Sequence, residues 1–346
     1  MVVLASIYGG IGQGLLYALV AIGIFVTFRV MKYPDLTIEG SFAFGGALAM
    51  TLIFHGVPSI IAIIIAMIGG GAAGFLTGII HTKLKIDGIV VGLLMTMALF
   101  SINLFVMGGS ANLSAPMDNF VFAPIASFFH NIIGMNPHYA NLTSHLVIGV
   151  FFVGLVITGL FFLYKTKFGL AIRATGSNEN MSRANGINTD TTKITALVIG
   201  NAIIALAGSL IAQHRSNASV TAGAGILVIG LAALVIGEVF MPKKSNFLIK
   251  FLCIVAGAVI FIVIRALILL AGLHPDAFRI ITAAVTLTAL CVPKVRDLIL
   301  VGRKPQLGEK MLSEVDLSNS QQETENDNTE VNALETSGEI GEAEQQ

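Results

Sequence analysis

The sequence predicts an all-α, polytopic membrane protein: a bundle of about eight to nine transmembrane segments, one of them short or broken, with a cytoplasmic coupling loop. Composition is the first reason, since 55% of the 346 residues are hydrophobic and only 12% are charged, whereas soluble domains carry about 25% charged residues. The apolar residues also gather in long runs, and Lys and Arg gather in alternate loops between those runs. Such a chain has too little polar surface to be covered by water and belongs in a bilayer.

Apolar runs mark the expected spans, because about 18 or more such residues cross the ~30 Å hydrocarbon layer. The runs fall at 4–28, 58–80, 88–107, 142–164, 194–213, 222–241, 246–270 and 277–293. A ninth segment, 41–54, has only 14 residues, which favours a half-helix or re-entrant element. If this segment crosses completely, the amino terminus lies outside; if it is re-entrant, the amino terminus lies inside.

Basic residues set the expected orientation, because cytoplasmic loops are enriched in Lys and Arg. They fall in the alternate loops at 83–85, 165–193, 243–244 and 294–304, which we therefore expect to be cytoplasmic. The opposite loops, at 54–58, 108–141, 214–221 and 271–276, contain Arg215 as their only strong base. The carboxyl-terminal tail is then cytoplasmic as well.

Two domains are expected, a transmembrane domain at 1–300 and a tail at 301–346. Residues 306–346 hold 11 acidic residues and one base, Lys310, while residues 1–305 hold 9 acidic and 19 basic residues. A tail this polar, with no aromatic residue, cannot bury enough apolar surface to offset the entropy of ordering it. We therefore expect a disordered, acidic tail whose removal changes uptake little.

Glycines at a spacing of four residues predict close helix packing. Gly70, Gly74 and Gly78 form one such series, and Gly10 and Gly14 form another. The expected reason is packing within one chain, and a dimer seam is the alternative.

The chain lacks the motifs of the common catalytic and metal sites. It has no G-x-x-x-x-G-K-[ST] phosphate loop, no H-E-x-x-H and no G-x-S-x-G. Its two cysteines, and histidines at 130, 138 and 145, match no metal-ligand spacing. We expect no cofactor, no metal and no catalytic residue, and no ATP bound through a phosphate loop.

The loop from Lys165 to Lys193 is the most informative polar stretch. Phe168 and Ile172 stand four residues apart on what would be one face of a short helix, Ser177 is placed to cap a second, and Gly186 is placed to end it. Two short helices with exposed apolar side chains favour a docking surface for a cytoplasmic partner. The alternative is an amphipathic loop that touches lipid headgroups.

A second polar stretch, Tyr33–Phe44, precedes the short segment. Asp35 and Glu39 lie beside a proline and a glycine that interrupt the helical pattern, and broken helices with ionisable groups often line transport paths. A solvated loop at the membrane surface is the alternative, and it explains both carboxylates without a function. Asn103 and Asn201 are weaker pathway candidates, since amides also hydrogen-bond between helices. We expect Glu238 to pair with Lys243 or Lys244, and Arg265 to reach the outer boundary rather than a ligand.

Four stretches together resemble bacterial ABC-importer permeases of the branched-chain amino acid (LivH and LivM) class, closest to the uncharacterised or tryptophan-type permease subfamily. They are YPDLTIEGSFAFGGALA, GLLMTMALFSINLFVMG, FGLAIRATGSNENMSRANGIN and IGLAALVIGEVF, and the likeness covers roughly residues 7–300. The resemblance implies a permease in the bacterial cell membrane that imports an aromatic or branched-chain amino acid. It also implies these ATPase-coupling residues: Phe168, Gly169, Ile172, Arg173, Ala174, Thr175, Gly176, Met181, Gly186 and Ile187.

The partners that the resemblance implies are a cytoplasmic ABC ATPase, an extracytoplasmic binding protein and a second permease copy or a related permease, with no nucleic acid. The chain itself is then not an enzyme. A self-sufficient carrier that couples transport to ions through Asp35 and Glu39 is the alternative.

Overall fold

The computed structural model describes residues 2–242 and 246–270, together with the single positions 284 and 287. It confirms the fold class, because these residues are mostly helical and seven of their helices are long and apolar enough to cross a membrane. The chain divides into two units, Met1–Leu290 and Cys291–Gln346. The expected tail at 301–346 lies outside the described residues, as does the expected span at 277–293 except for positions 284 and 287.

The first spanning helix, α1 (Val2–Ile24), continues into a π-helical stretch, η1 (Phe25–Val30). The other six spans are α2 (Thr37–Phe54), α3 (Ser59–Leu84), α4 (Gly88–Val106), α6 (Pro137–Lys165), α9 (Thr189–His214) and α11 (Phe247–Leu270). Shorter elements connect them: β1 (Asn112–Leu113), η2 (Met117–Asn119), α5 (Ala123–Asn131), α7 (Lys167–Ser177), α8 (Glu179–Ala184), β2 (Ala218–Ser219) and α10 (Ile226–Val239). The two strands pair antiparallel, with Asn112 opposite Ser219.

Two expected segments have different bounds in the structure. The span expected at 222–241 is wrong: only Ile226–Val239 is helical, 14 residues in all, because Gly225 begins the helix in a left-handed conformation with φ of 80°. The segment expected at 41–54 is longer than predicted, since α2 begins at Thr37 and has 18 residues. A search for apolar residues alone missed its polar first turn.

Small residues let the helices pack closely around the two most buried spans, α1 and α9. A Cβ added at Gly78 would lie 2.9 Å from the backbone of Ile194 in α9, and Gly70 and Gly74 face the same helix. On the other side, a Cβ at Gly14 would lie 2.7 Å from Val259 in α11. The prediction of packing within one chain is therefore confirmed for both glycine series.

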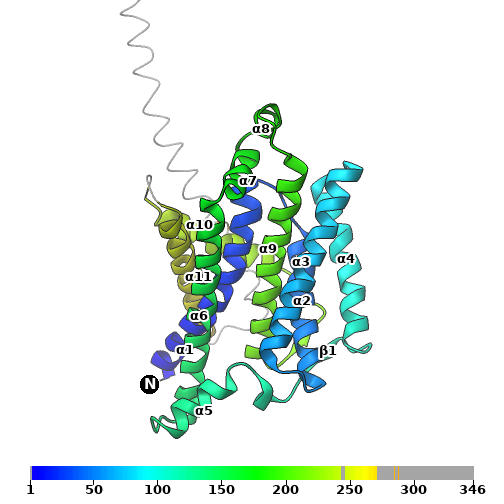
Figure 1. Cartoon of the computed structure of the whole chain (residues 1–346). Coiled ribbons are helices and arrows are strands. Elements are labelled where there is room, and N and C mark those ends of the chain that lie inside the picture. Colours follow the sequence, from blue (N-terminus) through cyan, green and yellow to red (C-terminus); the bar gives the residue numbers. More distant parts are fainter. Residues whose placement is uncertain (1, 243–245, 271–283, 285–286, 288–346) are drawn as a thin grey trace, which may run out of the picture. The chain divides into compact units, whose positions relative to one another are not determined.

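The short helices α7 and α8 lie at one end of the helical unit, and the amino end of α1 lies at the opposite end (Figure 1). Bases gather at the α7 end, where Arg29, Lys32, Arg173 and Lys250 line one cavity of about 340 Å³. The chain then reverses direction between η1 and α2. Of the two alternatives for segment 41–54, this arrangement agrees with the one in which the segment crosses the membrane completely. The amino terminus then lies on the side opposite the 165–193 loop.

Candidate coupling surface and transport pathway

Helix α7 is fixed to the bundle along one face. Gly169 lies against the backbone of Tyr164. Gly176 lies so close to the end of η1 that a Cβ would clash with the Val30 carbonyl and lie 2.9 Å from the Cα of Met31, the next residue. The hydroxyl of Thr192 in α9 donates to that of Thr175 at 3.0 Å. Thr166 caps the helix by accepting the N–H of Gly169. Helix α7 is therefore in direct contact with η1 and α9.

The prediction that Phe168 and Ile172 are both exposed is confirmed for Phe168 only. Phe168 is 38% exposed, but Ile172 is 1% exposed and packs with Met31, Tyr33 and Leu197. The expectation for Ile172 is wrong because α7 lies flat on the bundle, so that the edge of its apolar stripe faces inward. The ten ATPase-coupling residues that the resemblance implies also differ in exposure. Three are exposed (Phe168, Met181 and Gly186) and three are half-buried (Arg173, Ala174 and Ile187). The other four are buried (Gly169, Ile172, Thr175 and Gly176).

Helix α8 has a defined beginning and end. The side chain of Asn178, rather than Ser177 as expected, caps it by accepting the N–H of Met181 at 3.0 Å. At the other end Gly186, with φ of 78°, donates to the carbonyl of Arg183, and Ile187 donates to that of Ser182. This pair of hydrogen bonds is a Schellman motif, so Gly186 ends the helix as predicted.

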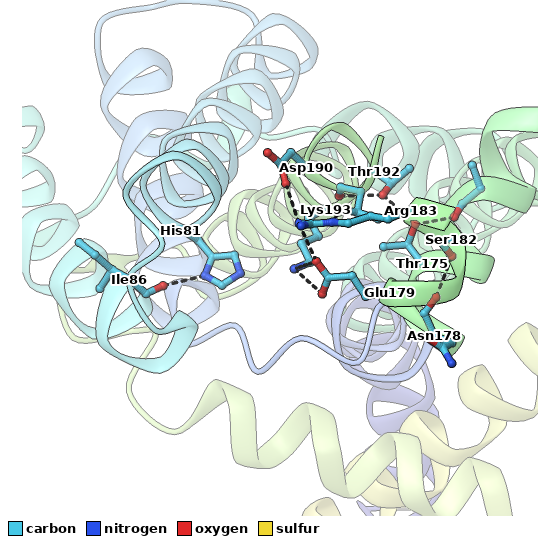
Figure 2. A network of polar contacts seen from close by, with 12 residues as sticks. His81, Ile86, Thr175, Asn178, Glu179, Ser182, Arg183, Asp190, Thr192 and Lys193 are labelled. Carbon is cyan, nitrogen blue, oxygen red and sulfur yellow. Dashed lines mark hydrogen bonds and ion pairs between the residues drawn. The ribbon is translucent and has the colours of Figure 1, made fainter. Parts of the chain in front are cut away.

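Four charged side chains tie α8 to the start of α9 (Figure 2). The Lys193 ammonium lies 2.8 Å from the Glu179 carboxylate, and the Arg183 guanidinium lies 3.1 Å from the same carboxylate and 3.5 Å from Asp190. Arg183 also donates to the hydroxyl of Thr189 at 2.8 Å. The network holds α8 against α9, beside an open cleft of about 570 Å³ that residues of the α3–α4 junction also line.

Glu179 makes this network sensitive to acid. The hydrogen bond from Lys193 and the nearby positive charges hold the pKa of Glu179 below its ordinary value. The network therefore stabilises the fold above the unfolded-state pKa of about 4.3, and its contribution is lost as pH falls through the folded-state pKa. We expect Glu179→Gln to reduce stability at pH 7 by at most ~1 kcal/mol, because the pair is partly exposed.

The measurement is thermal unfolding of wild type and E179Q in nanodiscs at pH 7 and at acid pH. The difference in Tm between the two proteins should shrink on acidification. A difference of the same size at both pH values contradicts the role of the Glu179 charge.

The chain between η1 and α2 is not helical, and side chains from α4 and α9 bind it. Asp35, which is fully buried, accepts the N–H of Thr37 at 2.9 Å and the Nδ2 group of Asn201 at 2.7 Å. The hydroxyl of Thr96 in α4 donates to the Leu36 carbonyl at 2.8 Å. These bonds replace the missing helical ones, since a backbone at membrane depth must be satisfied by protein.

Glu39 belongs to α2, and its side chain reaches the amino end of α10. Its carboxylate accepts the N–H of Gly225 at 3.0 Å, where the partial positive charge of the helix amino end favours an anion. The structure therefore brings Asp35 and Asn201 together but places Glu39 elsewhere. Asn103 is fully buried in α4, and within the described part of the chain neither of its amide atoms has a hydrogen-bond partner.

A cavity of about 730 Å³ lies beside Gly225, and we name it the outer cavity because the α9–β2 loop lines it, away from α7. Arg215 and Arg265 are both on its wall, and the expectation that Arg265 reaches the outer boundary rather than a ligand stays a prediction. Glu238 pairs with Arg29, which the return of α10 to the α7 end brings near, and its expected partners Lys243 and Lys244 lie outside the described residues. No contiguous pattern signals the outer cavity, whose arginines are far apart in sequence.

The described chain has seven long apolar helices. It also has a helix pair, α7–α8, packed at one end, and a non-helical break between η1 and α2. These features are those of a polytopic transport permease. The chain belongs to the family "Branched-chain amino acid transport system / permease component", whose model matches residues 6–290. This is an ABC-type permease family of sugar and amino acid importers.

Three curated relatives illustrate the range of the family. A tyrosine transport system permease protein of Clostridioides difficile is 31% identical over 278 residues, 80% of this chain and 88% of that protein. A probable branched-chain amino acid transport permease protein LivH of Methanocaldococcus jannaschii is 26% identical, over 66% and 72% of the two chains. The ribose import permease protein RbsC of Escherichia coli is 27% identical, over 59% and 60%. No solved structure matches.

Proposed function

We propose that this chain is the transmembrane permease subunit of an ABC importer that moves an aromatic or branched-chain amino acid into the cytoplasm. The observation that carries the proposal is the helix pair α7–α8, anchored through buried residues and exposing Phe168 and Met181, in a chain of a permease family. The substrate class follows the tyrosine and LivH relatives. A separate ATPase drives transport, and an extracytoplasmic binding protein delivers the solute.

The proposed mechanism passes through contacts already described. ATPase closure displaces α7, and α7 displaces η1 at Gly176 and α9 at Thr192. Helix α9 holds the interrupted segment through Asn201 and Asp35, so its movement shifts the start of α2. A ligand-driven switch needs such a chain of contacts with a different energy in each state. Two copies, or this chain and a related permease, form the pathway in the bacterial plasma membrane, with the tail on the cytoplasmic side.

The direct test is ATP hydrolysis. We expect the purified chain to hydrolyse no ATP above background, and to support vanadate-sensitive hydrolysis only with a co-expressed ATPase subunit, because its sequence has no phosphate loop. Phosphate release in proteoliposomes measures this. Vanadate-sensitive hydrolysis by the isolated chain contradicts the division of labour.

The second candidate is an ion-coupled carrier, which the buried Asp35 and half-buried Glu39 favour. Neighbouring genes for an ATPase and a secreted binding protein favour the importer, and their absence favours the carrier. Uptake that collapses with an ionophore while ATP is held constant would favour the carrier as well.

A further inference from the structure

A cavity of about 340 Å³ lies at the α7 end of the helical unit, and we name it the inner cavity. It is lined by residues from η1, α7, α10 and α11 and from the segments next to them. Three of these residues mark its depth: Arg29 is next to last in the first span, Met241 follows the C-cap of α10, and Lys250 is in the first turn of α11. The inner cavity therefore lies where the helices leave the hydrocarbon layer and meet the lipid headgroups.

The wall of the inner cavity is predominantly positive. Four bases and one acid line it among the described residues: Arg29, Lys32, Arg173, Lys250 and Glu238. The acid pairs with Arg29, and the other three bases have no acidic partner within the described part of the chain. Four bases against one acid leave an excess of three positive charges, which attracts an anion.

Phe247 holds two of these bases over its ring. The Arg173 guanidinium lies 4.8 Å and the Lys250 ammonium 5.2 Å from the ring centroid, which is within the range of cation–π attraction. Tyr164 of α6 stacks on the same ring, with the two centroids 5.1 Å apart. Both cations are therefore positioned before an anion arrives, which lowers the entropic cost of binding it.

Arg173 has hydrogen-bond donors to spare. The Tyr164 carbonyl accepts one of them at 3.3 Å, and within residues 2–242 and 246–270 the enclosed Nε has no acceptor. A guanidinium is planar, and its donors match the oxygens of a phosphate group in pairs, whereas lysine ammonium groups bind phosphate as point charges. Arg173, Lys32 and Lys250 together therefore match a phosphate group.

The apolar surroundings of the inner cavity favour a lipid as the source of this phosphate. Phe25, Val30 and Met241 also line the wall. Leu248 and Ile249, which lie between two lining residues of α11, are exposed, and at this depth exposed apolar side chains contact acyl chains. A free phosphate ion gains nothing from these residues, whereas a phospholipid binds them with its glycerol and chains.

We propose that the inner cavity binds the phosphate group of an anionic phospholipid through Lys32, Arg173 and Lys250. Basic pockets between membrane helices on the cytoplasmic side bind such headgroups, and the basic loops mark the α7 end as the expected cytoplasmic side. The bound phosphate contacts α7 and α11 at once, so it links the proposed coupling helix to a membrane span. The site is independent of which solute the chain transports.

Native mass spectrometry of the purified full-length chain, titrated with phosphatidylglycerol, tests the site. Lys32→Gln/Lys250→Gln removes two charges from the wall, and its matched control, Lys83→Gln/Lys165→Gln, removes two exposed charges at the same end of the unit that do not line the cavity. The first variant should bind the lipid at least tenfold more weakly than wild type, and the control less than threefold more weakly. Equal affinities of the two variants overturn the proposal.

Competing ligands identify the source of the phosphate. Phosphatidylcholine, whose own ammonium group compensates its phosphate, should bind wild type at least tenfold more weakly than phosphatidylglycerol does. Millimolar inorganic phosphate should leave phosphatidylglycerol bound. Displacement of the lipid by inorganic phosphate would mean that the cavity takes the free ion, and this result overturns the lipid site.

Phe247→Leu separates a built site from a charged surface, because it keeps every base and removes the ring beneath two of them. Its affinity for phosphatidylglycerol should fall at least threefold, and wild-type affinity in this variant would contradict the arrangement. Thermal unfolding gives a second readout, since a ligand of the folded state raises Tm. Wild type and the Lys83→Gln/Lys165→Gln control should have a higher Tm in phosphatidylglycerol nanodiscs than in phosphatidylcholine nanodiscs, and Lys32→Gln/Lys250→Gln should lose most of this difference.

Discussion

Replacing Phe168 with aspartate should abolish ATP-driven uptake while leaving the protein folded in the membrane. Phe168 is 38% exposed on α7 and belongs to neither buried hydrophobic cluster, so the substitution leaves both clusters intact. In a complex, the new carboxylate would be buried without a partner, which costs several kcal/mol, and loss of an aromatic anchor alone commonly costs 2 kcal/mol or more. Co-purification of the ATPase with the permease should therefore fall at least ~30-fold.

The control is Phe128→Asp, the same substitution at a residue that is 51% exposed in α5, at the end of the helical unit opposite α7 (Figure 1). This variant should co-purify with the ATPase at the wild-type yield. Ile172→Asp provides the opposite comparison: because Ile172 is 1% exposed, it should lower Tm before it affects docking. If F168D co-purifies the ATPase at the wild-type yield and its Tm is unchanged, the proposal that Phe168 on α7 contacts the ATPase is contradicted.

The part of the fold that depends on sequence-local properties was predictable. Long apolar runs gave six of the seven spans, and the four-residue spacing of Gly70, Gly74 and Gly78 gave close packing, because both signals follow from one helix meeting lipid or a neighbour. The left-handed Gly186 at the end of α8 is local in the same sense. None of these features needs knowledge of which helices are neighbours.

The remainder depends on contacts between distant segments. Helix α2 can begin at Thr37 because Asn201 and Thr96, far along the chain, satisfy the backbone and carboxylate before it. Helix α10 begins only at Gly225 because the preceding chain packs against the backbone of Glu39. Arg215 and Arg265 share a cavity although 50 positions separate them. Hydropathy and the spacing of residues within one segment do not indicate which distant residues come into contact.

Asp35 and Glu39, equivalent in sequence, should respond differently to substitution. Asp35→Leu removes the acceptor of two buried donors, the Thr37 N–H and the Asn201 amide. Each unsatisfied buried group costs about 1–3 kcal/mol, so this variant should lose ~2–6 kcal/mol of stability and most of its uptake. Asp35→Asn keeps one acceptor oxygen and should lose less than half as much. Thermal unfolding in nanodiscs, read beside uptake, measures both effects.

Glu39→Gln should separate charge from structure. The glutamine oxygen can still accept the Gly225 N–H, so Tm should change little, whereas the negative charge that would accompany an ammonium group is gone. If Glu39 serves the pathway, uptake should fall at least tenfold while the ATPase remains bound, because an uncompensated charge in a low-dielectric passage is costly. Under the ion-coupled alternative, the same variant should instead abolish dependence on a proton or sodium gradient. Reconstituted uptake that requires ATP, ignores ionophores and is unchanged in E39Q would reject both the pathway role of Glu39 and the carrier, because neither survives loss of a charge that it requires.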